Sequence, residues 1–212
     1  MQKIKLYHWN RLTKCKFVIS IAISGFIYFT GCSSSKTTET EETTETTETT
    51  EQKYEEAEGT MIMNAAKEER QNEMYSKSVD STYLYWLNNK LLLLKNHTKC
   101  NIYALNTLFK AGFKTPKVNA LTKDLVDTAK FTDILPIIGI SDPELAKKGD
   151  LIVWNGHVII FEKLTKIKSD YYALAWWAGT SKADNGENVI NNVIYGKYKL
   201  SGYYVIRRPV KI

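Results

Sequence analysis

Two β-rich segments flank an Asn-Gly pair in the stretch Gly149-Asp150-Leu151-Ile152-Val153-Trp154-Asn155-Gly156-His157-Val158-Ile159-Ile160-Phe161. An Asn-Gly pair in this setting is the strongest short-range signal for a β-hairpin with a type I′ turn, in which Asn155 takes a positive φ. The stretch therefore predicts two antiparallel strands, over residues 151–154 and 157–162. His157 is expected at the first position of the second strand.

Further β-rich runs follow the hairpin, over residues 171–177, 189–199 and 203–207. Helical spacing of apolar residues predicts three helices ahead of it, over residues 65–94, from Thr98 to Gly112, and over 121–129. Because the helices come first and the strands follow, we expect an α+β fold.

The apolar faces of the first two predicted helices are expected to lie in the core. Thr98 is the expected N-cap of the second helix and Gly112 its C-cap, with Pro116 beyond. The face of the first helix comprises Tyr83, Trp86, Leu87, Leu91 and Leu94, and that of the second comprises Ile102, Leu105, Leu108 and Phe109.

The N-terminus has the pattern of an export signal. Basic residues precede an apolar run over 17–29, which is too short to span a bilayer comfortably. Phe29-Thr30-Gly31-Cys32 resembles a bacterial lipobox, so residues 1–31 are expected to be a signal peptide and Cys32 the lipid-modified residue. The alternative is a retained signal anchor with Cys32 as an ordinary thiol. Either way, we expect an exported protein held at a bacterial membrane.

Charges are segregated along the rest of the chain. Residues 33–58 hold nine Glu and two Lys, a net charge of −7, and almost no apolar residues, so 32–58 is predicted to be a disordered acidic tether. Residues 59–212 hold 22 Lys and Arg against 14 Asp and Glu, a net charge of +8, and form one predicted domain. The excess positive charge suits anionic partners outside the cell, or serves only solubility. No basic-aromatic motif points to nucleic acid.

One thiol has a special position. Cys15 lies in the export signal and Cys32 is the expected lipidation site, so Cys100 has no partner for a disulfide. A lone thiol is either an inert buried side chain or a reactive group. Its place in the first turn of a predicted helix favours a reactive thiol, because unpaired N–H groups and the helix dipole stabilise a thiolate.

A nucleophilic thiol needs a base, and His97 and His157 are the histidines outside the signal. His97 is interpreted as a surface loop residue. His157 is predicted at a strand start, where a sheet can hold it against the N-terminus of a helix packed across it. The alternative is a hairpin-end histidine without a role.

These residues also carry a family resemblance. The segment Cys100-Asn101-Ile102-Tyr103-Ala104-Leu105, with Phe109-Lys110-Ala111-Gly112-Phe113 and Pro116 after it, resembles the nucleophile helix of the NlpC/P60 cysteine peptidases and the related CHAP amidases. The hairpin over 149–161 is similar to the histidine strand of that superfamily, and Arg207-Arg208-Pro209 resembles a common ending. The resemblance extends from about residue 83 to the C-terminus.

The resemblance implies a papain-like α+β fold that cleaves amide bonds in peptidoglycan, usually in the stem peptide, without a metal or cofactor. Cys100 would be the nucleophile and His157 the general base and later the acid. The backbone N–H of Cys100 would help to stabilise the oxyanion. The implied partner is peptidoglycan or a peptide, and a monomer is expected.

The family usually has a polar third residue that orients the histidine from the next strand. With a turn near Lys166, residues 175–177 would lie across from His157, and none of their side chains accepts a hydrogen bond. Asp170 would lie at the wrong end of the hairpin. The remaining candidates are a backbone carbonyl and the side chains of Thr180, Ser181 and Asp184.

The residues beside the nucleophile also differ from the family. Lys99 and Asn101 stand where Asp and Ser-Gly are typical, so the resemblance does not identify a substrate. Trp154 and Trp177 are candidate substrate-binding residues. Adjacent strand residues point to opposite faces, so one ring of Trp176-Trp177 is expected in the core and the other outward.

Three functions therefore remain open. The first is a lipid-anchored cysteine hydrolase of the cell wall, which the pairing of Cys100 with His157 favours. The second is a non-catalytic lipoprotein of the same fold that binds wall fragments or a partner protein, which the missing third residue favours. The third is acyl transfer to an acceptor other than water.

Overall fold

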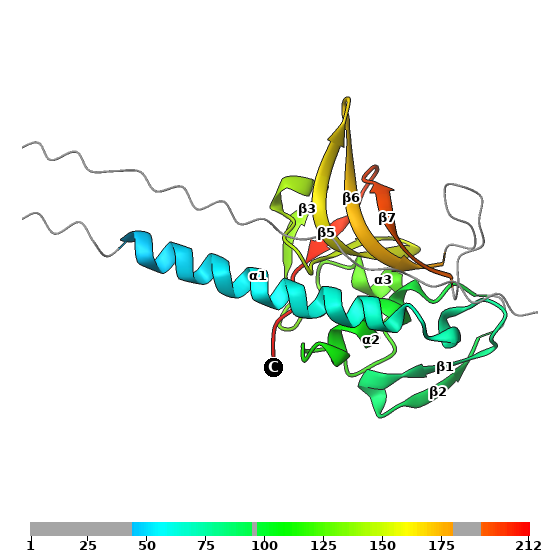
Figure 1. Cartoon of the computed structure of the whole chain (residues 1–212). Helices are drawn as coiled ribbons and strands as arrows, with labels where there is room; N and C mark the ends of the chain where they lie inside the picture. The colour runs from blue at the N-terminus through cyan, green and yellow to red at the C-terminus, as the bar shows by residue number, and fades with distance from the viewer. Residues whose placement is uncertain (1–43, 95–96, 180–191) are drawn as a thin grey trace, which may run out of the picture. The chain divides into compact units, whose positions relative to one another are not determined.

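The computed structural model describes residues 44–94, 97–179 and 192–212 (Figure 1). They form an α+β protein with two antiparallel sheets, as the order of helical and β-rich segments predicts. The signal, the lipobox with Cys32, and Thr180, Ser181 and Asp184 lie outside the described residues. None of the described helices is both long and apolar enough to span a membrane.

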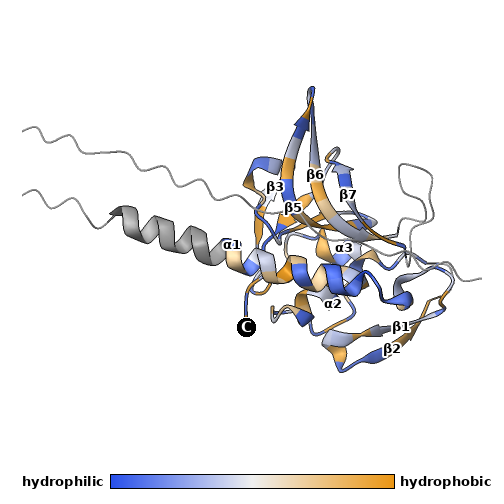
Figure 2. Cartoon of the chain, in the orientation of Figure 1, coloured by the Kyte–Doolittle hydropathy of each residue, from blue (hydrophilic) through white to orange (hydrophobic). Residues whose placement is uncertain are grey.

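A six-stranded antiparallel sheet is the centre of the fold, with the strand order β3-β8-β4-β5-β6-β7. Figure 1 shows that β5 and β6 form a long hairpin whose far end projects beyond the helices. Figure 2 shows that this end is hydrophilic. The strands are β3 (Ile137–Ile140), β4 (Leu151–Trp154), β5 (His157–Ile167), β6 (Asp170–Ala178), β7 (Val193–Lys199) and β8 (Val205–Arg207).

The helices α1 (Thr44–Glu69) and α2 (Cys100–Lys110) pack on one side of this sheet. Nine residues of α2, from Cys100 to Leu108, are buried, and the hydroxyl of Tyr103 donates to the carbonyl of Ala66 in α1 (2.8 Å). The core on this side includes Ile102, Leu105, Leu151, Val153, Val158, Ile160 and Trp176. Successive side chains of a strand point to opposite faces of the sheet, so every second residue of β4 and β5 belongs to this core.

The other face of the sheet carries a second apolar cluster. Ile152, Ile159 and Phe161 point to it from β4 and β5, and Leu200 and Tyr204 cover it from the segment between β7 and β8. Trp177 belongs to this second cluster and Trp176 to the first, so the prediction that the two rings point to opposite faces is confirmed. Both rings are buried, so the expectation that one of them points outward is wrong.

The predicted helix over residues 65–94 is wrong beyond Glu69. The chain instead forms the 3-10 turn η1 (Glu73–Tyr75), the strand β1 (Ser81–Leu84), the turn η2 (Tyr85–Leu87) and the strand β2 (Lys90–Leu93). β1 and β2 pair antiparallel, with Tyr83 opposite Leu91. Asn88 and Asn89 take left-handed φ values of 55° and 56°, which a continuous helix excludes.

The expected apolar face of that helix is therefore divided. Trp86 is buried, whereas Tyr83 and Leu91 are 47% and 50% exposed on the outward face of the small sheet. Asn106 of α2 fixes this segment, because its side chain accepts from the backbone N–H of Tyr85 (2.8 Å) and donates to the carbonyl of Tyr83 (2.9 Å).

The other elements agree with the sequence in outline. α2 begins at Cys100 with Lys99, not Thr98, as its N-cap. Its C-cap is Ala111, not Gly112, which follows with a positive φ of 80°. Phe109 is 43% exposed, so its assignment to the buried face is wrong. The third predicted helix is the single turn α3 (Thr122–Leu125). The strand β3 and the turn η3 (Pro143–Leu145) were not predicted.

The predicted hairpin over 151–162 is present with a two-residue loop, because Trp154 pairs with His157. Its turn is not type I′: Gly156 has φ 105°, whereas Asn155 is not among the residues with positive φ. A type I′ turn needs a positive φ at both positions. Glycine alone supplies the left-handed conformation here.

The helix α1 extends into the segment predicted to be a disordered tether, since it begins at Thr44 and not after Glu58. Its C-terminal part is anchored by Ile62, Met63, Ala65 and Ala66, which are buried in the first cluster. A docked segment of this kind supplies a nucleus from which a helix propagates into the adjacent Thr/Glu tract.

Gly59 marks the point where α1 meets the loop before β4. A Cβ atom on Gly59 would lie 2.4 Å from the carbonyl oxygen of Lys148, a backbone atom. We expect Gly59→Ala to lower the free energy of unfolding by about 2 kcal/mol, measured by urea denaturation. In an undocked helix the same change would raise stability by about 1 kcal/mol, so a stabilising result would contradict the docking. Thr60→Ala is the control at the exposed neighbour.

Candidate functional site

Cys100 is the first residue of α2 and is almost completely buried, with 2% of its surface exposed. It packs in the cluster between the helices and the sheet, where α2 contacts β5. The backbone N–H groups of Cys100, Asn101 and Val158 and the hydroxyl of Thr98 donate to its sulfur. Val158 directly follows His157, so the thiol lies beside the start of the histidine strand.

Two opposing effects act on the pKa of this thiol. Burial raises the pKa above its ordinary value, because a thiolate loses solvation, while the three N–H groups and the Thr98 hydroxyl lower it by stabilising the negative charge. Burial is the larger effect, so the pKa of Cys100 is raised overall. In the substrate-free protein the thiol is therefore protonated at neutral pH.

His157 lies at the first position of β5, as predicted, and its ring packs among aromatic side chains. Its imidazole stacks on the ring of Tyr198 in β7, with centroids 5.1 Å apart and planes at 21°. Trp154, its cross-strand partner, lies 6.5 Å away. Both neighbours pack against the second apolar cluster, so the imidazole is positioned on the sheet face opposite the one that α2 covers.

The imidazole is kept neutral by this environment. Burial lowers the pKa of His157 from 6.5 to about 4, because the charged ring would lose its solvation. Its Nε2 atom is buried and has no hydrogen-bond partner. The site therefore contains a neutral imidazole and a protonated thiol, and Nε2 makes no hydrogen bond to the thiol.

Tyr198 is a site residue that the sequence analysis missed. It stacks on His157 and meets Trp177 edge to face at 5.2 Å. Burial raises the pKa of Tyr198, and the nearby Cys100 raises it further, so this side chain lies near both candidate catalytic groups. It stands 41 residues after His157, and no local sequence pattern connects the two.

The expected register of the histidine hairpin is wrong by three residues. The turn between β5 and β6 falls at 168–169, since Ile167 pairs with Asp170. Nearer to His157, a bulge between Phe161 and Lys163 shifts the register again. Ile160 pairs with Trp176, so continuing the ladder places Gly179, and not residues 175–177, across from His157. The chain then enters residues 180–191, so the polar candidates for a third residue lie outside the described residues.

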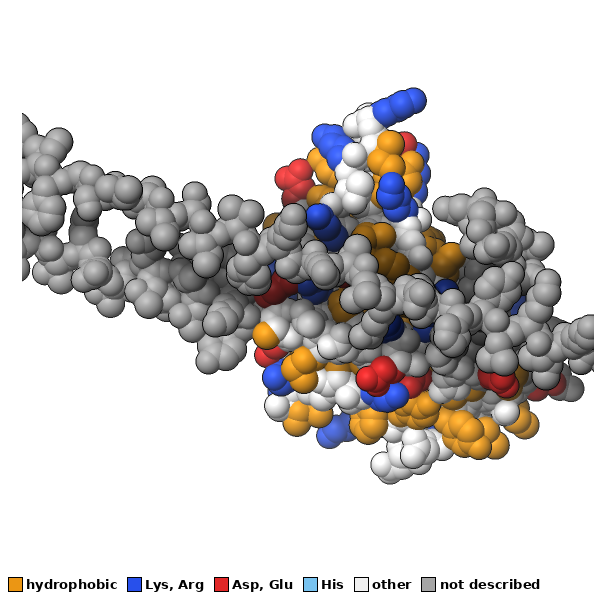
Figure 3. Space-filling model, in the orientation of Figure 1, with side chains coloured by type: hydrophobic (Ala, Val, Ile, Leu, Met, Phe, Trp, Pro, Cys, Tyr) orange, Lys and Arg blue, Asp and Glu red, His pale blue; other side chains and the backbone are white. Residues whose placement is uncertain are grey.

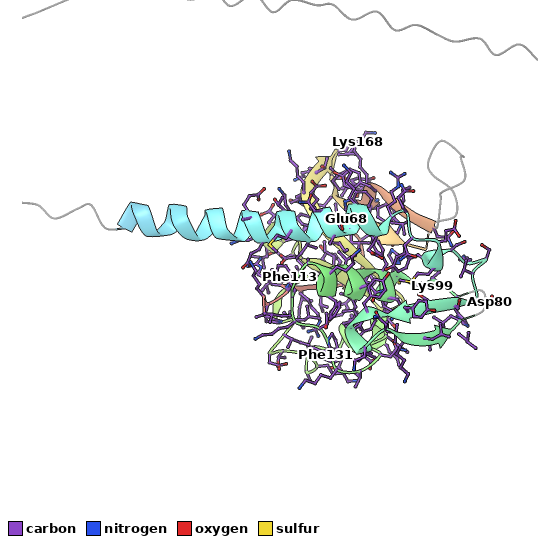
Figure 4. The ribbon with its side chains drawn as sticks, turned by 60° about the horizontal axis from the view of Figure 1, so that its bottom comes forward. Glu68, Asp80, Lys99, Phe113, Phe131 and Lys168 are labelled. Carbon is purple, nitrogen blue, oxygen red and sulfur yellow. The ribbon has the colours of Figure 1, made fainter. Side chains whose placement is uncertain are left out.

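Lys99 explains one difference from the family pattern. Its side chain is buried, and its ammonium group donates to the carbonyls of Met74 (2.5 Å), Val79 (2.7 Å) and Ser76 (3.2 Å). Figure 4 labels Lys99 near Asp80, the residue directly before β1. This lysine therefore fixes the segment before β1, and its ammonium group is held by backbone carbonyls of that segment.

The two tryptophans predicted to bind substrate differ in exposure. Trp177 is 7% exposed, so its ring offers almost no surface to a ligand in this structure. Trp154 is partly exposed; its indole N–H donates to the carbonyl of Ser201 (2.9 Å), and its ring lies 5.3 Å from that of Tyr204. Of the two, Trp154 is the one that a ligand can reach.

The described part of the chain contains no group of three or more His, Cys, Asp or Glu side chains that could hold a metal ion. The fold and the site thus define an α+β protein with a thiol at a helix N-terminus beside a strand that begins with histidine. Comparison with family models, curated proteins and solved structures gives no match.

The neutral state of His157 predicts a pH dependence of stability. Its pKa is lower in the folded protein (about 4) than in the unfolded chain (6.5), so its contribution is complete above pH 6.5 and is lost as the pH falls to 4. Between pH 6.5 and pH 4, we expect the free energy of unfolding of the wild type to fall by up to about 3 kcal/mol relative to that of His157→Phe. Urea denaturation of both proteins from pH 7 to pH 4 measures the difference. Parallel curves would contradict the buried neutral histidine.

Proposed function

We propose that this protein is a cysteine hydrolase that cleaves amide bonds in peptidoglycan, with Cys100 as nucleophile and His157 as general base. The observation that carries the proposal is the thiol at the first residue of α2, with three backbone N–H groups aimed at its sulfur. The resemblance of residues 100–116 and 149–161 to NlpC/P60 and CHAP proteins supports the substrate class and a papain-like arrangement.

The proposed chemistry begins from the neutral pair. The sulfur of Cys100 attacks the amide carbonyl carbon while the imidazole of His157 accepts the thiol proton. The N–H groups near the sulfur stabilise the oxyanion of the tetrahedral intermediate. The imidazolium then gives its proton to the departing amine, and water, activated by the same imidazole, hydrolyses the thioester to a carboxylate and regenerates the thiol.

The imidazole packs against Tyr198 on the sheet face opposite α2, so the proposal requires it to turn toward the thiol when substrate is bound. In many substrate-free enzymes the catalytic hydrogen bonds are long and shorten only in the complex. The unpartnered Nε2 of His157 fits this requirement, because a buried nitrogen without a partner gains a hydrogen bond when it meets the thiol or the substrate.

The expected cellular setting comes from the sequence. An export signal over 1–31 and lipidation at Cys32 would place the domain at the outer side of a bacterial membrane, within reach of the wall. The length of the acidic segment after Cys32 would set how far the domain can extend from the membrane toward the wall. Both features lie outside the described residues and form part of the proposal.

A second candidate is a non-catalytic lipoprotein of the same fold that binds wall fragments. The raised pKa of Cys100 and the low pKa of His157 favour it, because neither group is charged for catalysis in the substrate-free state. Iodoacetamide alkylation of Cys100 across pH, in the wild type and in His157→Ala, separates the two. Alkylation that depends on His157 supports the hydrolase, and indifference to His157 supports the binding protein.

The direct test is digestion of purified peptidoglycan by the full chain, with mass spectrometry of the soluble products. We expect fragments that carry one new amino end and one new carboxyl end at a single type of amide bond. Products in which an added amine replaces water at the new carbonyl would instead identify an acyl transferase. The absence of any released fragment over a range of wall types would overturn the hydrolase proposal.

A further inference from the structure

The outer end of the β5–β6 hairpin, with the adjacent part of β7, gathers positive charge. Figure 3 shows lysine side chains around this projection. We call it the basic end; it comprises Lys163, Lys166, Ile167, Lys168, Tyr172, Lys197 and Lys199, and its five lysines are exposed.

Most of this charge is not neutralised within the described residues. Lys199 pairs with Asp170 (2.6 Å), but Lys163, Lys166, Lys168 and Lys197 form no ion pair with any described side chain. Two other nearby carboxylates accept hydrogen bonds from tyrosine hydroxyls: Glu162 from Tyr195, and Glu144 from Tyr171 (2.9 Å). The basic end therefore has an excess of positive charge that faces solvent.

Strand pairing places part of this charge on one face. Lys163, Leu174 and Lys197 form one cross-strand row, and Thr165, Tyr172 and Lys199 form the next. Paired residues of neighbouring strands share a face, so Lys163, Lys197 and Lys199 point to the same side of the sheet. Leu174 lies between two cations in the first row, and Tyr172 lies beside one cation in the second.

The extreme tip combines charge with an apolar side chain. Ile167 is 40% exposed and stands between Lys166 and Lys168. Figure 4 labels Lys168 at this outermost point. Behind the tip, the ammonium group of Lys166 lies 4.9 Å from the centroid of the Tyr171 ring. The order from the tip inward is thus an isoleucine between cations, followed by tyrosines.

We propose that the basic end docks on the surface of a membrane that contains anionic lipid. Lysines near such a surface are attracted to lipid phosphates, and their alkyl stems lie along apolar material while the charges stay at the phosphates. Isoleucine enters the boundary of the acyl chains, and tyrosines are favoured at the level of the head groups. The projection of the hairpin beyond the helices lets its tip reach a flat surface.

A membrane explains the tip better than a soluble anionic polymer does. A polymer would use the lysines alone and would gain little from an exposed isoleucine at the outermost position. The inference is independent of the proposed hydrolase activity, because it rests on residues away from Cys100 and His157.

The test is sedimentation of the full chain with vesicles of phosphatidylcholine alone and of phosphatidylcholine mixed with phosphatidylglycerol. Binding to the neutral vesicles measures the contribution of the N-terminal segment, and the increase with phosphatidylglycerol measures the charge-dependent part. We expect the combined changes Lys163→Gln, Lys166→Gln, Lys168→Gln and Lys197→Gln to lower this increase by about tenfold or more. The matched control changes four exposed lysines elsewhere to Gln: Lys90, Lys114, Lys117 and Lys123.

A second variant separates a membrane from a soluble polyanion. We expect Ile167→Ser to weaken binding to phosphatidylglycerol vesicles and to leave binding to inorganic polyphosphate unchanged. An equal loss in the control lysine variant, or full binding by the four-lysine variant, would overturn the proposal. Tight polyphosphate binding together with no effect of Ile167→Ser on vesicle binding would overturn it in favour of a soluble anionic polymer.

Discussion

The Cys100→Ala variant is expected to release peptidoglycan fragments at a rate at least about 10³-fold below that of the wild type. Without the sulfur no covalent intermediate forms, whereas substrate binding and the oxyanion-stabilising N–H groups remain. The measurement is the initial rate of fragment release by the full chain, followed by mass spectrometry. His157→Gln is expected to cause a loss of similar size, because the imidazole accepts the proton in the same step.

Two controls make this result specific. His97→Gln changes an exposed histidine three residues before the nucleophile, and full activity is expected. Removing a buried thiol also leaves a small cavity, so the unfolding midpoint of Cys100→Ala must stay well above the assay temperature. A folded Cys100→Ala variant that still releases fragments at the wild-type rate would show that the thiol is not the nucleophile.

Replacement of Arg207 by methionine is expected to lower the free energy of unfolding by about 4 kcal/mol. Arg207 is fully buried, and its guanidinium donates to the backbone carbonyls of Leu125, Leu135 and Asp127. Methionine keeps much of the volume but leaves three carbonyls without their donor, two of them at fully buried residues. Urea denaturation at neutral pH measures the loss.

The control for Arg207→Met is Lys211→Met, an exposed cation four residues later for which a change below about 0.5 kcal/mol is expected. Arg207→Lys should remain strongly destabilising, since a single ammonium group does not reproduce the planar fork that reaches three separate carbonyls. A stability of Arg207→Met close to the wild type would show that this arginine does not join the 125–135 segment to β8.

Local signals in the sequence were sufficient for the hairpin and for the helix of Cys100. An Asn-Gly pair between two β-rich runs favours a tight turn of four residues, so the presence of the hairpin depends little on the rest of the chain. The helix α2 likewise has apolar spacing and a glycine with positive φ just after it. These two elements bring Cys100 and His157 into one region, so the sequence alone predicted both candidate catalytic residues.

The failures have tertiary causes. Residues 81–93 have the apolar spacing of a helix, but Asn106, more than 20 positions away, bonds to the backbone of Tyr83 in β1 and of Tyr85 at the start of η2. The residue that pairs with His157 depends on a bulge after Phe161, and no glycine or other turn residue at that point predicts the bulge. Tyr198 reaches His157 only because the sheet brings β7 toward the start of β5.

The sequence by itself determined the α+β class, the lone thiol at a helix start, the histidine at a strand start and the segregation of charge, because each follows from local pattern or composition. Only the tertiary structure decided the ionisation and surroundings of the site. Burial raises the pKa of Cys100 and lowers that of His157 to about 4. Desolvation depends on every side chain packed around a group, and those neighbours come from strands and helices far apart in the chain.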